Sequence, residues 1–390
     1  MAIINSVMVV FGLTSTLGVN NAIIRLIPEY KKKYPSSSSY LIFKKSFKIV
    51  FIFSLISGFV FFISSSFISH TIFTNKQLEF LLPIAAIFVI PQAIMTISNE
   101  TLRALKKIKL FAFNQLVYSI VFLIILLLLT QLDFNLYNPI YAVFASILFV
   151  SVVVVSFVFN FLKKKYRDDK QSVKSKQIIS LALPMFMTSS IHLIIANTDI
   201  WCLGIMLTEE YVGIYSVAIK LTLLSSFILT AFNGIIAPKF SELFYSGKMS
   251  DLKSVAQNSA KLTFWITFPM TVILIFFGKF ILGFWGEFFE IGYLALVMLA
   301  IGQFVNVAAG SVGLFLEMTG NQNVYRNIVF AGGIINIILN VALIPKYGIN
   351  GAAFASMVSI SFWNIAASIY IKKTFGFSIS YFSQIIPCYK

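Results

Sequence analysis

The sequence predicts an all-α integral membrane protein of about eleven transmembrane helices in two parallel-repeat bundles. The first observation behind this is composition: mean hydropathy is +0.90, and of the 390 residues 58% are hydrophobic and only 11% are charged. Soluble domains carry about a quarter charged residues. The second is that apolar stretches of about 20 residues, the length needed to cross a bilayer, recur along the whole chain. The third is that these stretches repeat at a regular spacing.

Each apolar stretch is expected to be a helix rather than a barrel strand. Lone strands leave backbone groups unsatisfied in lipid, and these segments are too long and too uniformly apolar for barrel strands. Short polar connections separate them. The predicted spans, in chain order, are residues 5–27, 46–68, 79–99, 110–130, 139–162, 178–206, 211–237, 261–282, 290–316, 324–344 and 349–371.

The positive charges predict the orientation of these spans. The chain has 30 Lys and Arg against 14 Asp and Glu, a net charge of +16. Twenty-four of the basic residues lie in connections on one side of the predicted membrane and three lie on the other. Because basic residues favour the cytoplasmic side, we expect a multi-pass protein of the plasma (inner) membrane with a cytoplasmic C-terminus. The positive charge is then explained by the lipid bilayer surface, and no nucleic acid partner is expected.

The spacing of the segments indicates an internal repeat in one direction. Spans that start at 46, 110 and 139 correspond to spans that start at 261, 324 and 349, at offsets of 215, 214 and 210. Parallel repeats are a recurring transporter architecture. Segment 178–206 has no partner in the first half, so we expect a parent design of six plus six helices whose opening helix is missing here. The predicted domains are a five-helix bundle over 1–162, a basic cytoplasmic linker over 163–177, a six-helix bundle over 178–373 and a tail over 374–390.

The connections contain no catalytic motif. The sequence has no phosphate-binding loop and no HExxH, CxxC or DxD pattern. Cys202 and Cys388 are too few for a cysteine-rich metal site, and His70 and His192 are too far apart to form a local ligand pair. We therefore expect no enzyme activity, no cofactor and no metal. Energy for transport has to come from an ion gradient, the membrane potential or the substrate gradient.

Ionisable residues within the spans are the main candidates for a functional site, because burying a charge at membrane depth is costly. Lys220 and Asp199 lie in consecutive spans at similar depth. They are expected either to form a structural ion pair or to place a cation in a central cavity with the carboxylate as its partner. Arg25, near the end of the first span, either extends to the lipid headgroups or holds an anionic headgroup at the cavity mouth. A cavity presenting Lys220 and Arg25 favours an anionic substrate.

Other polar residues in the spans are expected to have structural roles. Glu100 and Glu317 occupy corresponding positions near the ends of their spans, at an offset of 217. Pro184, Pro238 and Pro269 are expected to kink helices. Neutral side chains are expected to form interhelical hydrogen bonds rather than contacts to a sugar. These are His192, Asn197, Asn233, Gln303, Asn306, Asn336 and Asn340.

Three stretches of the sequence resemble a known family. The segment NNAIIRLIPEY, residues 20–30, is similar to the end of the second helix in polysaccharide repeat-unit (O-antigen type) flippases of the multidrug/oligosaccharidyl-lipid/polysaccharide (MOP) exporter superfamily. Residues 183–199 resemble the seventh helix of that family, and residues 212–220 resemble the eighth. The resemblance extends from the family's second helix to its twelfth.

The resemblance implies a MATE-like pair of helical bundles that works by alternating access. The implied activity is to move an undecaprenyl-diphosphate-linked oligosaccharide repeat unit from the cytoplasmic to the outer leaflet, for O-antigen, lipopolysaccharide or capsule biosynthesis. It implies that Arg25 and Lys220 meet the diphosphate or acidic sugars. It further implies H⁺ or Na⁺ as a coupling ion and polysaccharide polymerase machinery as a partner. Two alternatives stay open: a MATE-type antiporter of drugs or cations, and an inactive product of a truncated gene.

Overall fold

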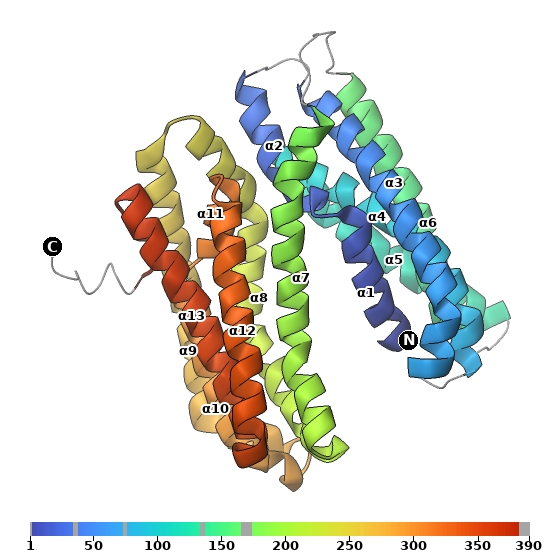
Figure 1. Ribbon diagram of the computed structural model, residues 1–390. Helices are drawn as coiled ribbons and strands as arrows, with labels where there is room; N and C mark the ends of the chain where they lie inside the picture. Colours follow the sequence, from blue (N-terminus) through green and yellow to red (C-terminus); the bar gives the residue numbers. More distant parts are fainter. Residues whose placement is uncertain (1, 34–37, 73–75, 133–136, 165–173, 382–390) are drawn as a thin grey trace. The chain divides into compact units, whose positions relative to one another are not determined.

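The computed structural model describes residues 2–33, 38–72, 76–132, 137–164 and 174–381 (Figure 1). Every regular element in this part of the chain is helical. In chain order the elements are α1 (Ala2–Thr16), α2 (Val19–Lys33), α3 (Ser38–Phe67), the π-helix η1 (Ile68–Ile72), α4 (Lys76–Ala104), α5 (Ile108–Leu132), α6 (Asn138–Lys163), α7 (Ser175–Met206), α8 (Glu209–Tyr245), α9 (Met249–Gly283), the 3-10 helix η2 (Glu287–Gly292), α10 (Tyr293–Ala309), α11 (Val312–Met318), α12 (Gln322–Tyr347) and α13 (Ile349–Phe375).

The described residues contain eleven stretches that are long and apolar enough to cross a membrane. The predicted number of spans and their helical class are therefore confirmed. The helices continue through Pro184, Pro238 and Pro269. Two predicted spans need correction, because 5–27 and 290–316 are each built from two helices and not from one.

Both corrections concern a break inside an apolar stretch. Between α1 and α2, Leu17 and Gly18 have φ angles of 45° and 72°, and a β-carbon at Gly18 would collide with the backbone of α7. Between α10 and α11, Gly310 has a φ of 76°. There the chain after α13 returns to the break, and the carbonyl of Ala308 accepts hydrogen bonds from Tyr381 N–H at 3.1 Å and Ser380 Oγ at 3.2 Å. Irregular backbone at membrane depth is tolerated where protein groups satisfy it in this way.

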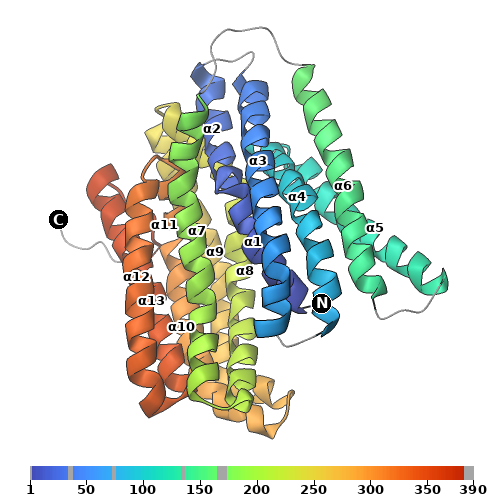
Figure 2. The same cartoon turned by 45° about the vertical axis from the view of Figure 1, so that its right-hand side comes forward.

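The chain forms two compact units, Met1–Phe186 and Met187–Lys390, and the division falls inside α7. In the first unit α4 packs on α3 and α6, and both α1 and α2 contact α3 and α4. α5 lies at the edge of this unit against α6 (Figure 2). Most of the predicted linker 163–177 lies outside the described residues, and the predicted domain boundaries stay a prediction.

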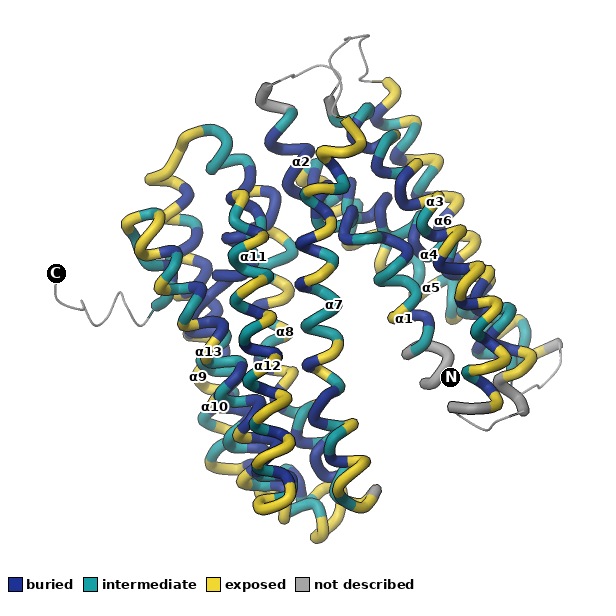
Figure 3. The backbone as a smooth tube through the Cα atoms, in the orientation of Figure 1, coloured by how far each residue is buried: buried dark blue, intermediate teal, exposed yellow. Residues whose placement is uncertain are grey.

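The second unit repeats these neighbour relations. α10 packs on α9 and α13, as α4 packs on α3 and α6, and α12 lies against α13, as α5 lies against α6. Its core is a cluster of twelve buried apolar residues near the end of α7, which we call the large cluster. Exposed positions recur along the helices on faces turned away from such cores (Figure 3). The large cluster consists of Leu203, Ile214, Tyr215, Ala218, Leu282, Ala295, Leu296, Leu299, Ile344, Ile349, Ala352 and Ala353.

Candidate functional site

A buried carboxylate in the second unit is the centre of a polar network that joins four helices. Asp199 on α7 is 4% exposed, and its carboxylate accepts hydrogen bonds from three other helices. Tyr215 Oη on α8 donates at 2.6 Å, and Ser356 Oγ on α13 donates at 2.5 Å. From α12, Asn340 Nδ2 donates at 2.7 Å and Asn336 Nδ2 at 3.3 Å. All four donors are neutral, so oriented dipoles rather than a cation meet this charge.

The spacing of the donors explains how they converge. Asn336 and Asn340 are four residues apart on α12, so they share one face of the helix, and Asn340 Nδ2 also lies 3.2 Å from Asn336 Oδ1. Asn336 Nδ2 also lies 3.4 Å from Ser356 Oγ and from Ser359 Oγ on α13. Asn340 Oδ1 is buried and has no hydrogen-bond partner within the described ranges. One acceptor oxygen next to Asp199 is therefore still available.

Small residues bring the helices of this network close together. A β-carbon at Gly333 would lie 3.3 Å from Ile195 Cδ1 on α7. A β-carbon at Gly332 would lie 2.9 Å from Trp363 Cε3 on α13. Glycine at an interface lets neighbouring backbones approach, so the two glycines of α12 set its distance from α7 and from α13.

A second polar contact lies on the same three helices, nearer the start of α7. Tyr325 Oη on α12 is 3.4 Å from His192 Nε2 on α7. The His192 ring meets the indole of Trp363 edge-on, with ring centroids 5.5 Å apart. Trp363 is buried together with Ile195 and Val329. One layer of apolar side chains therefore separates this pair from the carboxylate network.

The structure does not bring Lys220 and Asp199 together. Lys220 is exposed on α8, and no ion pair or hydrogen bond joins the two side chains in the part of the chain that is described. Tyr215, which does reach Asp199, precedes Lys220 by five residues, a rotation of about 140° around an α-helix. The expected structural ion pair is therefore not formed, and the role of Lys220 as a substrate-binding cation stays a prediction.

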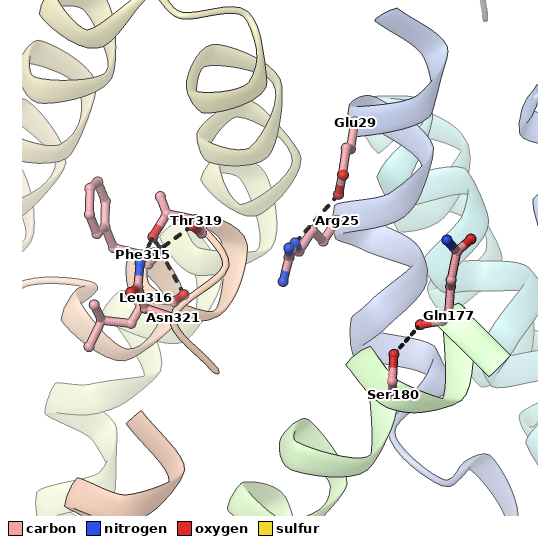
Figure 4. Close-up of polar contacts among 8 residues, drawn as sticks. All are labelled: Arg25, Glu29, Gln177, Ser180, Phe315, Leu316, Thr319 and Asn321. Carbon is pink, nitrogen blue, oxygen red and sulfur yellow. Dashed lines mark hydrogen bonds and ion pairs between the residues drawn. The ribbon is translucent and has the colours of Figure 1, made fainter. Parts of the chain in front are cut away.

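Arg25 lies in the first unit and is held by its own helix. Its side chain on α2 is buried, and Nε lies 3.6 Å from Glu29 Oε2, one turn further on (Figure 4). The guanidinium therefore does not extend from the helix as an exposed side chain. Its expected contact with an anion stays a prediction, and such a contact has to compete with Glu29.

The corresponding carboxylates Glu100 and Glu317 have different surroundings. Glu100 Oε2 accepts a hydrogen bond from Arg103 at 3.1 Å. Glu317 is half-buried at the end of α11, beside a turn closed by hydrogen bonds of Thr319 and Asn321 (Figure 4). It forms no ion pair with any described residue and lies outside the candidate spans. Burial raises the pKa of Glu317 to about 8.

The expectation that neutral side chains link helices is met at some positions and not at others. Asn336 and Asn340 bond across helices, and Asn233 on α8 accepts a hydrogen bond from Ser311 Oγ. Asn197 and Asn306 instead donate within their own helices. Tyr215 and Ser356 were not predicted from the sequence as partners of Asp199. The four-residue spacing of Asn336 and Asn340 was the available signal for a polar helix face.

The Asp199 network brings the oxygen atoms of acidic and neutral side chains together. Among the residues described, no three His, Cys, Asp or Glu side chains are placed to hold a metal ion. The Asp199 network offers carboxylate, amide and hydroxyl oxygens in an apolar setting. Such oxygens accept a proton or bind a hard cation.

Comparison with known proteins identifies the family. The family model described as polysaccharide biosynthesis protein matches residues 1–287, more than half of the chain. A Haloferax volcanii protein named as probable low-salt glycan biosynthesis flippase Agl15 is 26% identical over 191 residues, 49% of this chain and 40% of that protein. The uncharacterized membrane protein MJ1068 of Methanocaldococcus jannaschii is 23% identical over 375 residues, 90% of this chain and 72% of that protein. The chain thus spans less than half the length of the first of these relatives.

Solved structures share the fold. The Vibrio cholerae MATE transporter VcmN aligns with a TM-score of 0.77 and 13% identity over 95% of this chain and 86% of that one. At such low identity the likeness shows the fold alone. It confirms the predicted MATE-like, all-helical fold. Since the family model matches the larger part of the sequence, the chain belongs to the polysaccharide biosynthesis protein family.

Proposed function

We propose that this chain is a flippase that moves an undecaprenyl-diphosphate-linked oligosaccharide repeat unit from the cytoplasmic to the outer leaflet of the plasma membrane. The product would be a surface polysaccharide such as O-antigen or capsule, and the movement would use alternating access. Family membership supports the class of cargo, as does the relative named as a glycan biosynthesis flippase. The uneven distribution of Lys and Arg supports the direction, with the Lys-rich connections in the cytoplasm.

Transport is coupled, in this proposal, to H⁺ or Na⁺ bound at Asp199. The observation that carries it is the buried carboxylate surrounded by neutral donors, with Asn340 Oδ1 left without a partner. Rotating the Asn340 amide by half a turn would bring this oxygen toward Asp199. Two oxygens face each other stably when a proton or a cation lies between them. Because the network joins four helices, ion binding and release would favour different packings of the second unit.

The anionic diphosphate of the substrate is proposed to meet Lys220 and Arg25. Lys220 is exposed, so its ammonium group is available without rearrangement. Arg25 must exchange its contact with Glu29 for one with phosphate, to which a guanidinium donates paired hydrogen bonds. We therefore expect Lys220 to contribute to the first binding step and Arg25 to contribute after a conformational change.

The test is complementation of a gene deletion in the native cell. Lipid-linked oligosaccharide on the cytoplasmic face and polysaccharide on the surface are both quantified. The wild-type chain is expected to clear the first and restore the second. Asp199→Asn is expected to fail, and Lys220→Ala to be impaired while Lys220→Arg is partly active. Lys261→Ala, at another exposed lysine, is the matched control and is expected to act as wild type.

Different outcomes address different parts of the proposal. Full complementation by Asp199→Asn would exclude ion coupling at that residue. Full complementation by Lys220→Ala would exclude Lys220 as a substrate contact. Unchanged oligosaccharide and polysaccharide, together with gene-dependent efflux of a cationic dye, would favour the drug or cation antiporter.

A further inference from the structure

The Asp199 network is covered by different numbers of apolar residues on its two sides along α7. Toward the end of α7, the twelve residues of the large cluster lie beside it. Toward the start of α7, a cluster of three buried residues lies between the network and His192, with Ile191, Tyr325, Ile328 and Ile360 packed against it. We call these three residues the thin layer; they are Ile195, Val329 and Trp363. Within the second unit the carboxylate is therefore far less deeply enclosed on the His192 side.

Trp363 has the largest side chain of the thin layer. Its indole lies against the backbone of Gly332, where a β-carbon would be 2.9 Å from Cε3, so only glycine leaves it room. Within the described ranges the indole N–H donates no hydrogen bond. The side chain is thus held by packing alone, and it can turn without breaking a polar contact.

Polar groups lie on both sides of this indole. On the carboxylate side, Ser359 is one turn from Trp363 on α13, and its hydroxyl lies 3.4 Å from Asn336 Nδ2. On the other side, the His192 ring meets the edge of the indole, and Tyr325 Oη is 3.4 Å from His192 Nε2. An ion that leaves the network in this direction passes from oxygen ligands to another polar pair across a single side chain.

We propose that Trp363 is a gate between the Asp199 site and the end of the second unit at which α7 begins, and that His192 and Tyr325 receive the ion when the indole turns aside. The proposal rests on the proposed binding of an ion at Asp199. Local opening of one packed side chain requires far less free energy than opening a large apolar core. In this conformation the site therefore exchanges ions toward the start of α7, which is the cytoplasmic side in the orientation proposed above.

The experiment measures how fast a water-soluble carbodiimide modifies Asp199 in the full chain, reconstituted in vesicles and analysed by peptide mass spectrometry. Trp363→Ala is expected to accelerate the modification about tenfold or more, because it removes most of the thin layer. Trp363→Phe keeps a ring at this position and is expected to stay within about threefold of wild type. Trp265→Ala replaces an exposed indole on α9 and is the matched control, with an unchanged rate expected.

A variant at the opposite end tests the direction of the route. Leu203→Ala removes a fully buried side chain of the large cluster and is expected to change the rate less than Trp363→Ala does. A wild-type rate in Trp363→Ala, or a larger acceleration in Leu203→Ala, would overturn the gate. If Trp363→Ala does not fold, Val329→Ala decides, since it removes another side chain of the thin layer and is expected to accelerate the modification severalfold. An unchanged rate in Val329→Ala would then overturn the thin layer as the barrier.

The same assay separates the gate from the function on which it rests. A modification rate that Na⁺ does not slow, with the pH profile of an ordinary exposed carboxylate, would overturn ion binding at Asp199. Acceleration by Trp363→Ala alone would still establish the indole as the barrier, because the carbodiimide reports access to the carboxylate and not transport.

Discussion

The corresponding helices α12 and α5 show how the two units of this chain differ. About a third of the most apolar stretch of α12 is buried, whereas none of that stretch in α5 is. α12 faces α7 with Asn336 and Asn340, which bond to Asp199. At the repeat offset of 214, α5 has Phe122 and Leu126 in their place. Polar side chains are thus found where a neighbouring helix supplies partners for them, and apolar ones where the helix surface is left open.

The two units also differ in where the partners of their charged side chains lie. In the first unit, Arg25 pairs with Glu29 and Arg103 with Glu100 within single helices, and His70 pairs with Glu79 between η1 and the adjacent α4. In the second unit, Asp199 is bonded by side chains from three further helices. Pairs within one helix do not report on helix packing, but a carboxylate shared by four helices does. In the proposed coupling, binding of an ion at Asp199 would therefore act on four helices at once.

The largest expected effect is that of Asp199→Ala, which removes the acceptor of four buried hydrogen bonds. Leaving a buried polar network without its charged member costs about 3–5 kcal/mol of unfolding free energy. The matched change in the first unit is Glu100→Ala. The partner of Glu100 lies on the same helix, so the expected loss of unfolding free energy is about 1 kcal/mol. Denaturant unfolding followed by tryptophan fluorescence measures the first variant, because all four tryptophans lie in the second unit. Calorimetry measures the second, and equal losses would remove the distinction between the units.

A smaller effect is expected when the interface between α7 and α12 is overpacked. Gly333→Leu forces a side chain against Ile195, for a loss of about 2 kcal/mol. The corresponding position on α5 is Ser119, which is exposed, and Ser119→Leu is expected to change stability by less than about 0.5 kcal/mol. Thermal unfolding of both variants by calorimetry provides the measurement. A large loss in Ser119→Leu would mean that α5 is covered in the native membrane.

Removing the hydroxyl of Tyr215 should lower the free energy of unfolding less than Asp199→Ala or Gly333→Leu does. Tyr215→Phe removes one of four donors to Asp199 and leaves the ring in the core, so about 1–1.5 kcal/mol is expected. Tyr118→Phe on α5 is the control in the first unit, where the structure gives this hydroxyl no hydrogen bond to a described residue. Equilibrium unfolding of the two variants should differ by about 1 kcal/mol. Equal values would mean that the bond from Tyr215 to Asp199 adds nothing to stability.

The number and order of the helices could be predicted from the sequence, because an apolar stretch of sufficient length has few alternatives in a bilayer. The breaks at Gly18 and Gly310 could not be predicted in this way. Each lies inside a continuous apolar stretch, and the second is stabilised by hydrogen bonds from Ser380 and Tyr381, about 70 residues away in sequence. Local composition carries no information about a partner at that distance.

The depth of Asp199 within a predicted span could be read from the sequence, but the residues that bond to it could not. Asp199 was identified because an acidic residue within a span is rare. Lys220 was the natural partner by charge and by depth, but the rotation of α8 turns Tyr215 toward the carboxylate instead. Side-chain packing sets that rotation, and a pattern of apolar residues on both sides of a helix does not reveal it.

The smallest expected effect is a pH dependence of stability due to Glu317. Burial raises the pKa of Glu317 from 4.5 to about 8 in the folded protein. Between these values the folded state retains a proton that the unfolded state has released, so stability falls as pH rises from about 5 to 8 and then levels off. The half-buried carboxylate is partly screened by solvent, so the total change is on the order of 1 kcal/mol. Glu317→Gln should remove this slope in the midpoint of thermal unfolding, measured by tryptophan fluorescence from pH 5 to 9. Glu100→Gln should retain the slope because it leaves Glu317 intact, and an identical slope in wild type and Glu317→Gln would assign the dependence to another group.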